Sequence, residues 1–293
     1  MSDELIPMNG SGDMVVRQPT PDDQILDLWL HGRSRATQRG YRAEATRFMA
    51  AVSKPLAQVT LTDLQDWADA IEAEGLEPAT RRRMLAAVKS LLSFSHKLGY
   101  LPFDTGKPLR LPTLRDTLAE RILDEPTVLR MIALEPKPRN AAILTLLYAA
   151  GLRVSELTGL RWRDVQVRQA GGQITVLGKG AKTRSILLPQ GVFERMMNLR
   201  GEAGEDAPVF RSRKGGHLDP SQVLRITHQA AKRSGVNRTV RNHDLRHCHA
   251  SHSLERGAPI SLVQQTLGHA QISTTGRYLH ARPNDSSSRY LPL

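Results

Sequence analysis

The sequence predicts a mainly α-helical protein with a small β-sheet, built as an N-terminal helical bundle followed by a mixed α+β domain. The 293 residues suffice for two domains with separate cores. Apolar residues recur at helical spacing along most of the chain, and a stretch rich in Pro, Gly and basic residues between Phe103 and Arg115 interrupts them. Two β-rich runs occur in the second half alone. We therefore expect the domain junction between the two blocks.

The N-terminal block, residues 20–104, is expected to contain four helices, preceded by a disordered tail over residues 1–19 that is rich in Gly, Ser, Pro and polar groups. The expected helices begin at Thr20-Pro21, span about 35–52, are capped by Thr62-Asp63, and open at Thr80. Gly75 and Gly99 should end the third and the fourth.

The fourth expected helix is strongly basic. Its apolar residues line one side, and its cations cluster elsewhere: Arg81, Arg82, Arg83 and Lys89. Two interpretations stay open, a surface that lies against DNA phosphates and an ordinary solvated charged face. Residues 105–117 are expected to be a basic linker that runs along or around DNA.

The second domain, residues 118–293, is expected to begin with helices from Asp124 and from about Asn140, the latter ending at Gly151. Arg153 follows this helix end, and the acidic Glu156 comes three residues later, a spacing that suits a structural ion pair. The runs 173–177 and 183–188 then predict a hairpin. Its tip and second strand carry basic residues that could approach a ligand or could be solvated: Lys179, Lys182 and Arg184.

The charge balance favours a polyanionic partner. Lys and Arg number 41 against 29 Asp and Glu, which gives a formal net charge of +12. No run approaches the roughly 18 apolar residues that span a bilayer, and the N-terminus does not resemble a signal sequence, so we expect no membrane association and a cytoplasmic protein. The single cysteine, Cys248, excludes an intramolecular disulfide and is expected to be a small buried side chain in a reducing compartment.

Residues 243–252 hold four of the ten histidines. His243 and His247 are one helical turn apart, which makes zinc binding an alternative, but no acidic or cysteine partner completes a ligand set. The other interpretation is that His243 and Arg246 contact one phosphate from one face of a helix, because residues at i and i+3 are neighbours there.

A tyrosine placed among phosphate-binding cations can attack a phosphodiester, and Tyr278, nine residues after His269, is the leading candidate. Tyr148 falls on the apolar stripe of its helix and is expected to be core. Tyr290 lies beyond a stretch of Pro, Asn, Asp and Ser that reads as flexible, so holding it against a phosphate would cost ordering entropy.

The succession of these residues resembles the tyrosine recombinases of the phage integrase family, which include the bacterial chromosome-dimer-resolving recombinases. The residues that carry the resemblance are, in order, Arg153, Lys179, His243, Arg246, His269 and Tyr278. The likeness covers nearly the whole chain. It implies a SAM-like core-binding domain over the first block and a catalytic domain of the DNA breaking-rejoining type over the second. In place of the Asn-Pro that often follows the first block, this chain has Phe103-Asp104.

The resemblance also implies the chemistry. Arg153 and Arg246 would hold the non-bridging oxygens, and His269 would add a hydrogen bond. His243 would orient the phosphate and accept the proton of Tyr278, and Lys179 would protonate the departing 5′ oxygen, leaving a 3′-phosphotyrosine. Glu156 would support the site without touching the phosphate. No ATP, metal ion or other cofactor is expected, because the covalent link conserves the phosphodiester energy.

The implied partner is a double-stranded DNA recombination site. By resemblance the protein would act as a homotetramer, or a heterotetramer with a related recombinase, on two such sites, with residues 281–293 docking on a neighbouring subunit and the protein associated with the nucleoid. Two other functions stay open: a type IB-like topoisomerase, which shares the phosphotyrosine chemistry, and a DNA-site-binding protein that does not cleave.

Overall fold

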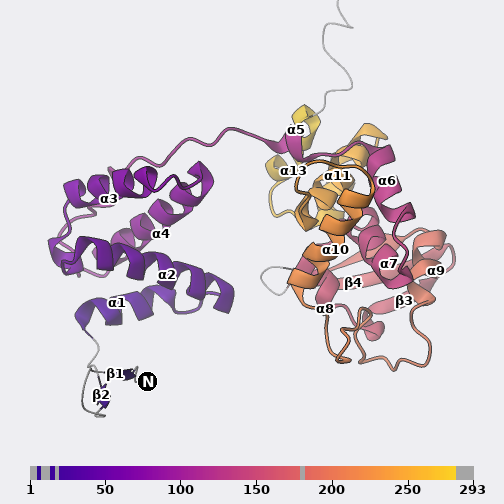
Figure 1. The fold of residues 1–293 in the computed structure, drawn as a ribbon, viewed down its shortest axis with the longest axis horizontal. Coiled ribbons are helices and arrows are strands. Elements are labelled where there is room, and N and C mark those ends of the chain that lie inside the picture. The colour runs from indigo at the N-terminus through magenta and orange to yellow at the C-terminus, as the bar shows by residue number, and fades with distance from the viewer. Residues whose placement is uncertain (1–4, 8–13, 17–19, 179–181, 282–293) are drawn as a thin grey trace, which may run out of the picture. The chain divides into compact units, whose positions relative to one another are not determined.

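The computed structural model describes residues 5–7, 14–16, 20–178 and 182–281. The contacts divide the chain into two compact units, residues 1–115 and 116–293, and each is described by itself (Figure 1). The protein is mainly helical with a small sheet, as predicted. Among the described residues, no helix combines the length and apolar character needed to span a bilayer.

Unit 1 is a bundle of four helices around an apolar core. The helices are α1 (Pro21–Leu30), α2 (Arg35–Val52), α3 (Leu61–Ala73) and α4 (Pro78–Lys97), with a 3-10 turn at Leu56–Gln58. Two short strands, β1 (Leu5–Pro7) and β2 (Met14–Val16), pair antiparallel ahead of them. These strands lie in the segment predicted to be a disordered tail, most of which is outside the described residues.

Helix starts in unit 1 follow the side chains that can cap a helix. Thr20 and Asp23 form a capping box at α1, as expected from the sequence. At α3 the cap is Thr60 and not Thr62, because Asp63 accepts a hydrogen bond from the Thr60 backbone while the Thr60 hydroxyl accepts one from Asp63. Helix α4 begins two residues before the expected Thr80, at Pro78, since proline suits the first helical turn.

Part of the predicted linker packs on unit 1. Thr105 and Leu109 are buried, and Lys89 of α4 donates to the backbone oxygens of Lys107 and Leu109. Arg82 donates to the backbone oxygen of Pro112. The segment up to about residue 112 is therefore held against α4 instead of running free.

Unit 2 packs helices around a three-stranded antiparallel sheet. Its strands are β3 (Val165–Arg168), β4 (Gly171–Leu177) and β5 (Thr183–Leu188), in that order across the sheet. Ile174 pairs with Val165 on one side and Ile186 on the other. The predicted hairpin is therefore present as β4 and β5, and residues 179–181 of its tip lie outside the described residues.

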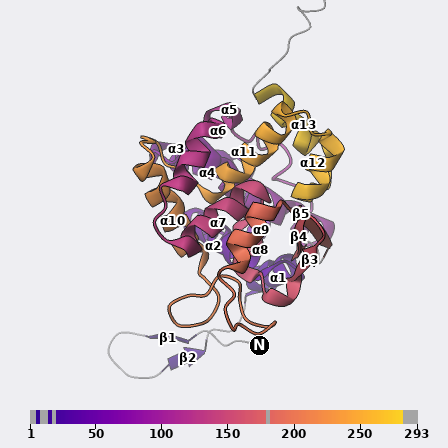
Figure 2. The same cartoon turned by 90° about the vertical axis from the view of Figure 1, so that its right-hand side faces the viewer.

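The helices of unit 2 surround one central helix, α11 (Asn242–Glu255), which packs against α5, α6, α7, α12 and α13 (Figure 2). The others are α5 (Leu118–Arg121), α6 (Glu125–Ala133), α7 (Pro138–Ala149), α8 (Val154–Gly159), α9 (Gln190–Met197), α10 (Pro220–Arg233), α12 (Ile260–Leu267) and α13 (Ile272–Ala281). Cys248 of α11 is fully buried, as expected. Side chains of α11 therefore reach most of the helices that carry the candidate site.

Candidate active site

Separate segments of unit 2 bring the predicted catalytic residues together. Arg153 immediately precedes α8, His243 and Arg246 lie on α11, His269 follows α12, and Tyr278 is on α13. Arg246 and Arg153 act electrostatically on both His243 and His269. The ring of His269 stacks on that of Tyr278, with centroids 6.5 Å apart and planes inclined by 8°. Lys179, the sixth predicted residue, lies outside the described residues.

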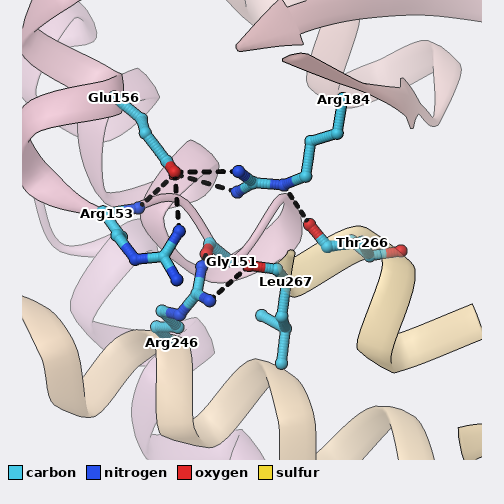
Figure 3. Close-up of polar contacts among 7 residues, drawn as sticks. All are labelled: Gly151, Arg153, Glu156, Arg184, Arg246, Thr266 and Leu267. Atoms are coloured by element: carbon cyan, nitrogen blue, oxygen red, sulfur yellow. Dashed lines mark hydrogen bonds and ion pairs between the residues drawn. The ribbon is translucent and has the colours of Figure 1, made fainter. Parts of the chain in front are cut away.

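A buried carboxylate, Glu156, holds two arginines in place (Figure 3). Its side chain is 2% exposed and accepts a hydrogen bond from Arg153 Nη1 at 2.9 Å, as well as one from the Arg153 backbone N–H at 2.8 Å. Arg184 binds the same carboxylate through both terminal nitrogens, at 2.8 and 2.9 Å. The structural ion pair expected between Arg153 and Glu156 is confirmed. All of these contacts point the carboxylate at protein groups, which agrees with a supporting role.

The charge of Glu156 is maintained by these partners. Burial raises the pKa of its carboxyl, but hydrogen bonds from Arg184 and Arg153 outweigh this effect and hold the pKa below its usual value. Glu156 is therefore ionised at neutral pH. A buried carboxylate of this kind holds the Arg184 guanidinium in a bidentate geometry and the Arg153 guanidinium through one nitrogen, an arrangement that a solvated pair would not keep.

Arg184 belongs to the framework of the site. It was predicted to contact DNA from the hairpin, but its side chain is only 12% exposed, and its Nε also donates to the backbone oxygen of Thr266 at 2.7 Å. Arg184 thus connects β5 to the end of α12. This arrangement positions the segment that leads to His269, and it uses the donors of Arg184 that a phosphate would otherwise bind.

Arg246 is held inside the protein by two backbone oxygens. The residue is 1% exposed and donates through Nη1 to Gly151 and through Nη2 to Leu267, each at 2.5 Å (Figure 3). Gly151 has φ of +56°, and a Cβ there would lie 2.6 Å from the Leu267 side chain. Glycine at 151 therefore allows α7 to end where its carbonyl meets Arg246.

Arg153 and Arg246 form an excess of positive charge at one place. Burial and the nearby Arg153 lower the pKa of Arg246 to about 10, and Glu156 offsets this only in part. The Nε of Arg246 has no hydrogen-bond partner among the described residues. Two guanidinium groups whose charges repel each other favour a bound anion, and planar guanidinium donors match the oxygens of a phosphate.

Tyr278 is buried, and its hydroxyl contacts a histidine that was not among the predicted catalytic residues. Tyr278 is 5% exposed, and its hydroxyl lies 2.7 Å from Nδ1 of His247. His247 in turn contacts His243, with ring centroids 4.4 Å apart. No hydrogen bond between His243 and Tyr278 occurs in the part of the chain that the structure describes. The hydrogen-bond partner of Tyr278 is thus His247, one helical turn after His243, and the role of His243 as proton acceptor stays a prediction.

The sequence contained one signal for His247, its position at i+4 from His243 on one helix face, but this spacing was read as a possible zinc site. The described residues contain no cluster of three or more His, Cys, Asp or Glu side chains that could hold a metal ion. The partner of His247 is Tyr278, 31 residues further along the chain.

His269 is oriented by a neighbouring hydroxyl. Its Nδ1 lies 2.9 Å from Oγ1 of the buried Thr275, at the start of α13. Burial, followed by the charges of Arg246 and Arg153, lowers the pKa of His269 to about 4. His269 is therefore neutral at pH 7 and can donate a hydrogen bond from one ring nitrogen while the other is engaged with Thr275.

The site opens into a surface depression of about 620 Å³. Basic side chains line it from three segments: Arg153 before α8, Lys182 and Arg184 of the hairpin, and His269 after α12. Lys182 is exposed at the rim, next to the hairpin tip. The opening is wide and lined by cations, as an approach for a charged polymer requires.

The four cations of α4 that were predicted to contact DNA have partners within unit 1. Arg81 pairs with Glu72, Arg83 pairs with Glu44, and Arg82 and Lys89 donate to the backbone oxygens described above. These contacts join α4 to α2, α3 and the segment that follows it. A DNA phosphate would have to compete with them, so DNA contact by α4 stays a prediction.

Known proteins share the sequence pattern over both units. The model of the phage integrase family matches residues 115–285, and the model of the phage integrase N-terminal SAM-like domain matches residues 25–97. The tyrosine recombinase XerC of Corynebacterium efficiens is 36% identical over 271 residues, which cover 89% of this chain and 84% of that protein.

Solved structures agree in fold. The recombinase XerH bound to its difH substrate aligns with a TM-score of 0.69 at 19% identity, covering 89% of this chain and 82% of that one. A lambda integrase tetramer bound to a Holliday junction gives 0.72 at 17% identity, covering 90% and 78%. With two arginines, a stacked histidine and a buried tyrosine brought together in unit 2, and with family models matching both units, this chain belongs to the phage integrase family, the tyrosine recombinases.

Proposed function

We propose that this tyrosine recombinase cuts and rejoins DNA at a specific site through attack of Tyr278 on a phosphodiester, which forms a 3′-phosphotyrosine. The observation that carries the proposal is the position of the Tyr278 ring against His269 and near Arg246. Tyr148 has its own partners elsewhere, and Tyr290 lies outside the described residues.

The arrangement supports a metal-free transesterification. The phosphate would lie between Arg153 and Arg246, whose guanidinium groups offset the charge that develops in the pentavalent transition state. The bond from Tyr278 Oη to phosphorus forms as the bond to the 5′ oxygen breaks, and the number of phosphodiester bonds is conserved. Lys179, assigned by its place in the hairpin sequence, would give the 5′ oxygen its proton. His243 would help to orient the phosphate, and His269 would donate to one of its oxygens.

The DNA partner is proposed to be a pair of double-stranded recombination sites held by four copies of the chain. The neighbouring lambda integrase structure is a tetramer on a Holliday junction, which supports this stoichiometry by fold likeness. Lys182 at the rim of the depression, and the α4 cations if they exchange partners, would contact the DNA backbone. A chromosomal target would place the protein on the nucleoid.

A covalent-trapping experiment tests the proposal. The cognate site would be selected from random duplex DNA. A nick placed just downstream of the scissile phosphate would let the short fragment that carries the released 5′ hydroxyl diffuse away, which traps the phosphotyrosine. We expect wild type and Tyr290→Phe to give a covalent protein–DNA adduct on denaturing gels. Tyr278→Phe should bind the same duplex with similar affinity and give no adduct.

An adduct that persists in Tyr278→Phe would overturn the assignment of the nucleophile. Recombinant products from two cognate sites are expected for the wild type. Relaxation of supercoiled DNA that lacks the site, without any recombinant product, would instead identify a topoisomerase. Site binding without adduct in the wild type would identify a binding protein that does not cleave.

A further inference from the structure

The Tyr278 hydroxyl has one side-chain hydrogen-bond partner among the described residues, the ring of His247. The distance from Tyr278 Oη to His247 Nδ1 is 2.7 Å, and the two rings are tilted by 46° with centroids 5.7 Å apart. Tyr278 is almost fully buried and His247 is half-buried, so water has limited access to the pair. A buried hydroxyl with a single strong acceptor has a defined direction for its proton.

We propose that His247 is a catalytic residue, the group that accepts the proton of Tyr278 as its hydroxyl attacks the phosphodiester. The inference rests on the function proposed above and adds a residue to it. It also separates two roles that sequence resemblance had assigned to His243. His243 would orient the phosphate, and His247 would accept the proton.

The step balances without any additional reactant. His247 begins neutral, with its hydrogen on Nε2 and the lone pair of Nδ1 directed at the phenol. The phenol proton moves to Nδ1 as the bond from Oη to phosphorus forms, and the bond from phosphorus to the 5′ oxygen breaks. The 5′ oxygen leaves with a proton from the general acid. In the reverse, rejoining reaction, the imidazolium of His247 returns its proton to Tyr278.

The charges around His247 couple this base to the substrate. Its neighbours are His243 and Arg246 on α11, Arg121 on α5, and Arg277 and Tyr278 on α13. Burial is the largest cause that lowers the pKa of His247, to about 3, and His243, Arg121, Arg246 and Arg277 lower it further. A phosphodiester anion bound by Arg153 and Arg246 offsets the cationic part of this effect. We therefore expect His247 to be a stronger base once DNA occupies the site.

The test measures single-turnover cleavage of the nicked cognate duplex by the full chain. We expect His247→Ala to reduce the rate of adduct formation by roughly 10²–10⁴-fold, the range that a general base supplies. Its affinity for the duplex should stay within about twofold of wild type, because His247 contacts no phosphate. His249→Asn, on the same helix with its ring bonded to the Tyr148 backbone, controls for replacing a buried histidine and should cleave at nearly the wild-type rate. An unchanged or faster rate in His247→Ala would overturn the proposal, and a faster rate would identify the contact as an inhibitory latch.

His247→Asn separates proton acceptance from mere positioning. The asparagine oxygen can occupy the place of Nδ1 and accept the hydrogen bond, but it cannot take up the proton. We expect the Asn variant to cleave more than tenfold slower than wild type. In wild type the rate should rise with pH as His247 loses its proton, and the Asn variant should lack this rise. A rate within tenfold of wild type would show that orientation alone suffices and would overturn the role of base.

A substrate with sulfur in place of the bridging 5′ oxygen distinguishes the base from the acid. A thiolate leaves without a proton, so this substrate should restore cleavage in Lys179→Ala and leave the His247→Ala defect in place. Rescue of His247→Ala by the sulfur substrate would assign His247 to the leaving group and overturn the proposal. An adduct formed by wild type with either substrate keeps the proposed function intact whatever the result for His247.

Discussion

Two histidines of helix α11 each contact a tyrosine hydroxyl, and the two pairs lie in regions of different charge. His247 Nδ1 is 2.7 Å from the hydroxyl of Tyr278, and His252 Nδ1 is 3.0 Å from that of Tyr148. Burial is the main cause that raises the pKa of both tyrosines. Neither a histidine partner nor burial therefore distinguishes the nucleophile from the structural tyrosine.

The surrounding charges do distinguish them. The Tyr148 hydroxyl also lies 3.3 Å from Glu125, whose carboxylate raises the pKa of Tyr148 further and would repel a phosphodiester. At Tyr278, Arg246 and Arg277 act in the opposite direction and lower the pKa. The same pair of side chains is thus a half-buried structural contact beside a carboxylate and a candidate for phosphoryl transfer beside arginines.

Replacing an arginine by lysine in each region tests this difference directly. The variant near Tyr278 should show the largest loss of cleavage, and the variant near Tyr148 should show almost none. In Arg246→Lys, one ammonium cannot contact both the Gly151 and Leu267 carbonyls and a phosphate, so we expect single-turnover cleavage to fall by roughly 10²–10³-fold, as for loss of a transition-state donor. In Arg256→Lys, which alters the exposed pair with Glu125 in the Tyr148 region, cleavage should stay within about twofold.

Thermal melting of both variants accompanies the kinetics, because Arg246 also joins three segments of the fold. Equal losses of cleavage in the two variants, at temperatures where both remain folded, would remove charge as the distinguishing feature.

Much of the fold follows from local sequence. The start of α3, which was predicted two residues too late, shows that the spacing of a capping box must be applied as well. The second helix, expected at about 35–52, and the two strands of the hairpin were confirmed. At α3, both Thr60 and Thr62 can cap a helix, and the acid at Asp63 decides between them because it lies three residues after Thr60. A capping box is readable from sequence once this spacing is applied.

The partners of charged and polar side chains at the site could not be predicted in the same way. Arg184 was expected at the DNA because it lies on a basic hairpin, yet it binds Glu156, 28 residues earlier. His247 was visible as the neighbour of His243, but its contact with Tyr278 depends on how α13 packs on α11. Residue order identifies which groups belong to a site, whereas the tertiary packing decides which atoms meet.

The burial of His247, together with the cations around it, also predicts how acid affects the stability of this region. The pKa of His247 is lowered to about 3, mainly by burial, while an unfolded histidine titrates near 6.5. Between these values the unfolded chain binds more protons than the native one, so the free energy of unfolding falls as the pH drops from about 6.5 toward 3. Relative to His247→Asn, which cannot titrate there, wild type should lose about 2 kcal/mol between pH 6.5 and 4.5. Urea unfolding of both proteins across this range measures the difference, and parallel curves would show that the site does not destabilise a charged His247.

The smallest effect is expected at Tyr148, and it separates packing from chemistry. Tyr148→Phe removes a hydroxyl bonded to His252 and close to Glu125, which should cost about 1–2 kcal/mol of stability, since a net hydrogen bond contributes about that much and its buried partner is left unsatisfied. For a domain of this size, a melting temperature lower by about 2–8 °C would follow. The rate of adduct formation should not change, whereas Tyr278→Phe, the same chemical substitution beside the same helix, should give no adduct. If Tyr148→Phe slowed cleavage markedly at temperatures where it remains folded, the two His–Tyr pairs of α11 would be coupled, and the carboxylate beside Tyr148 would have to be counted as part of the active site.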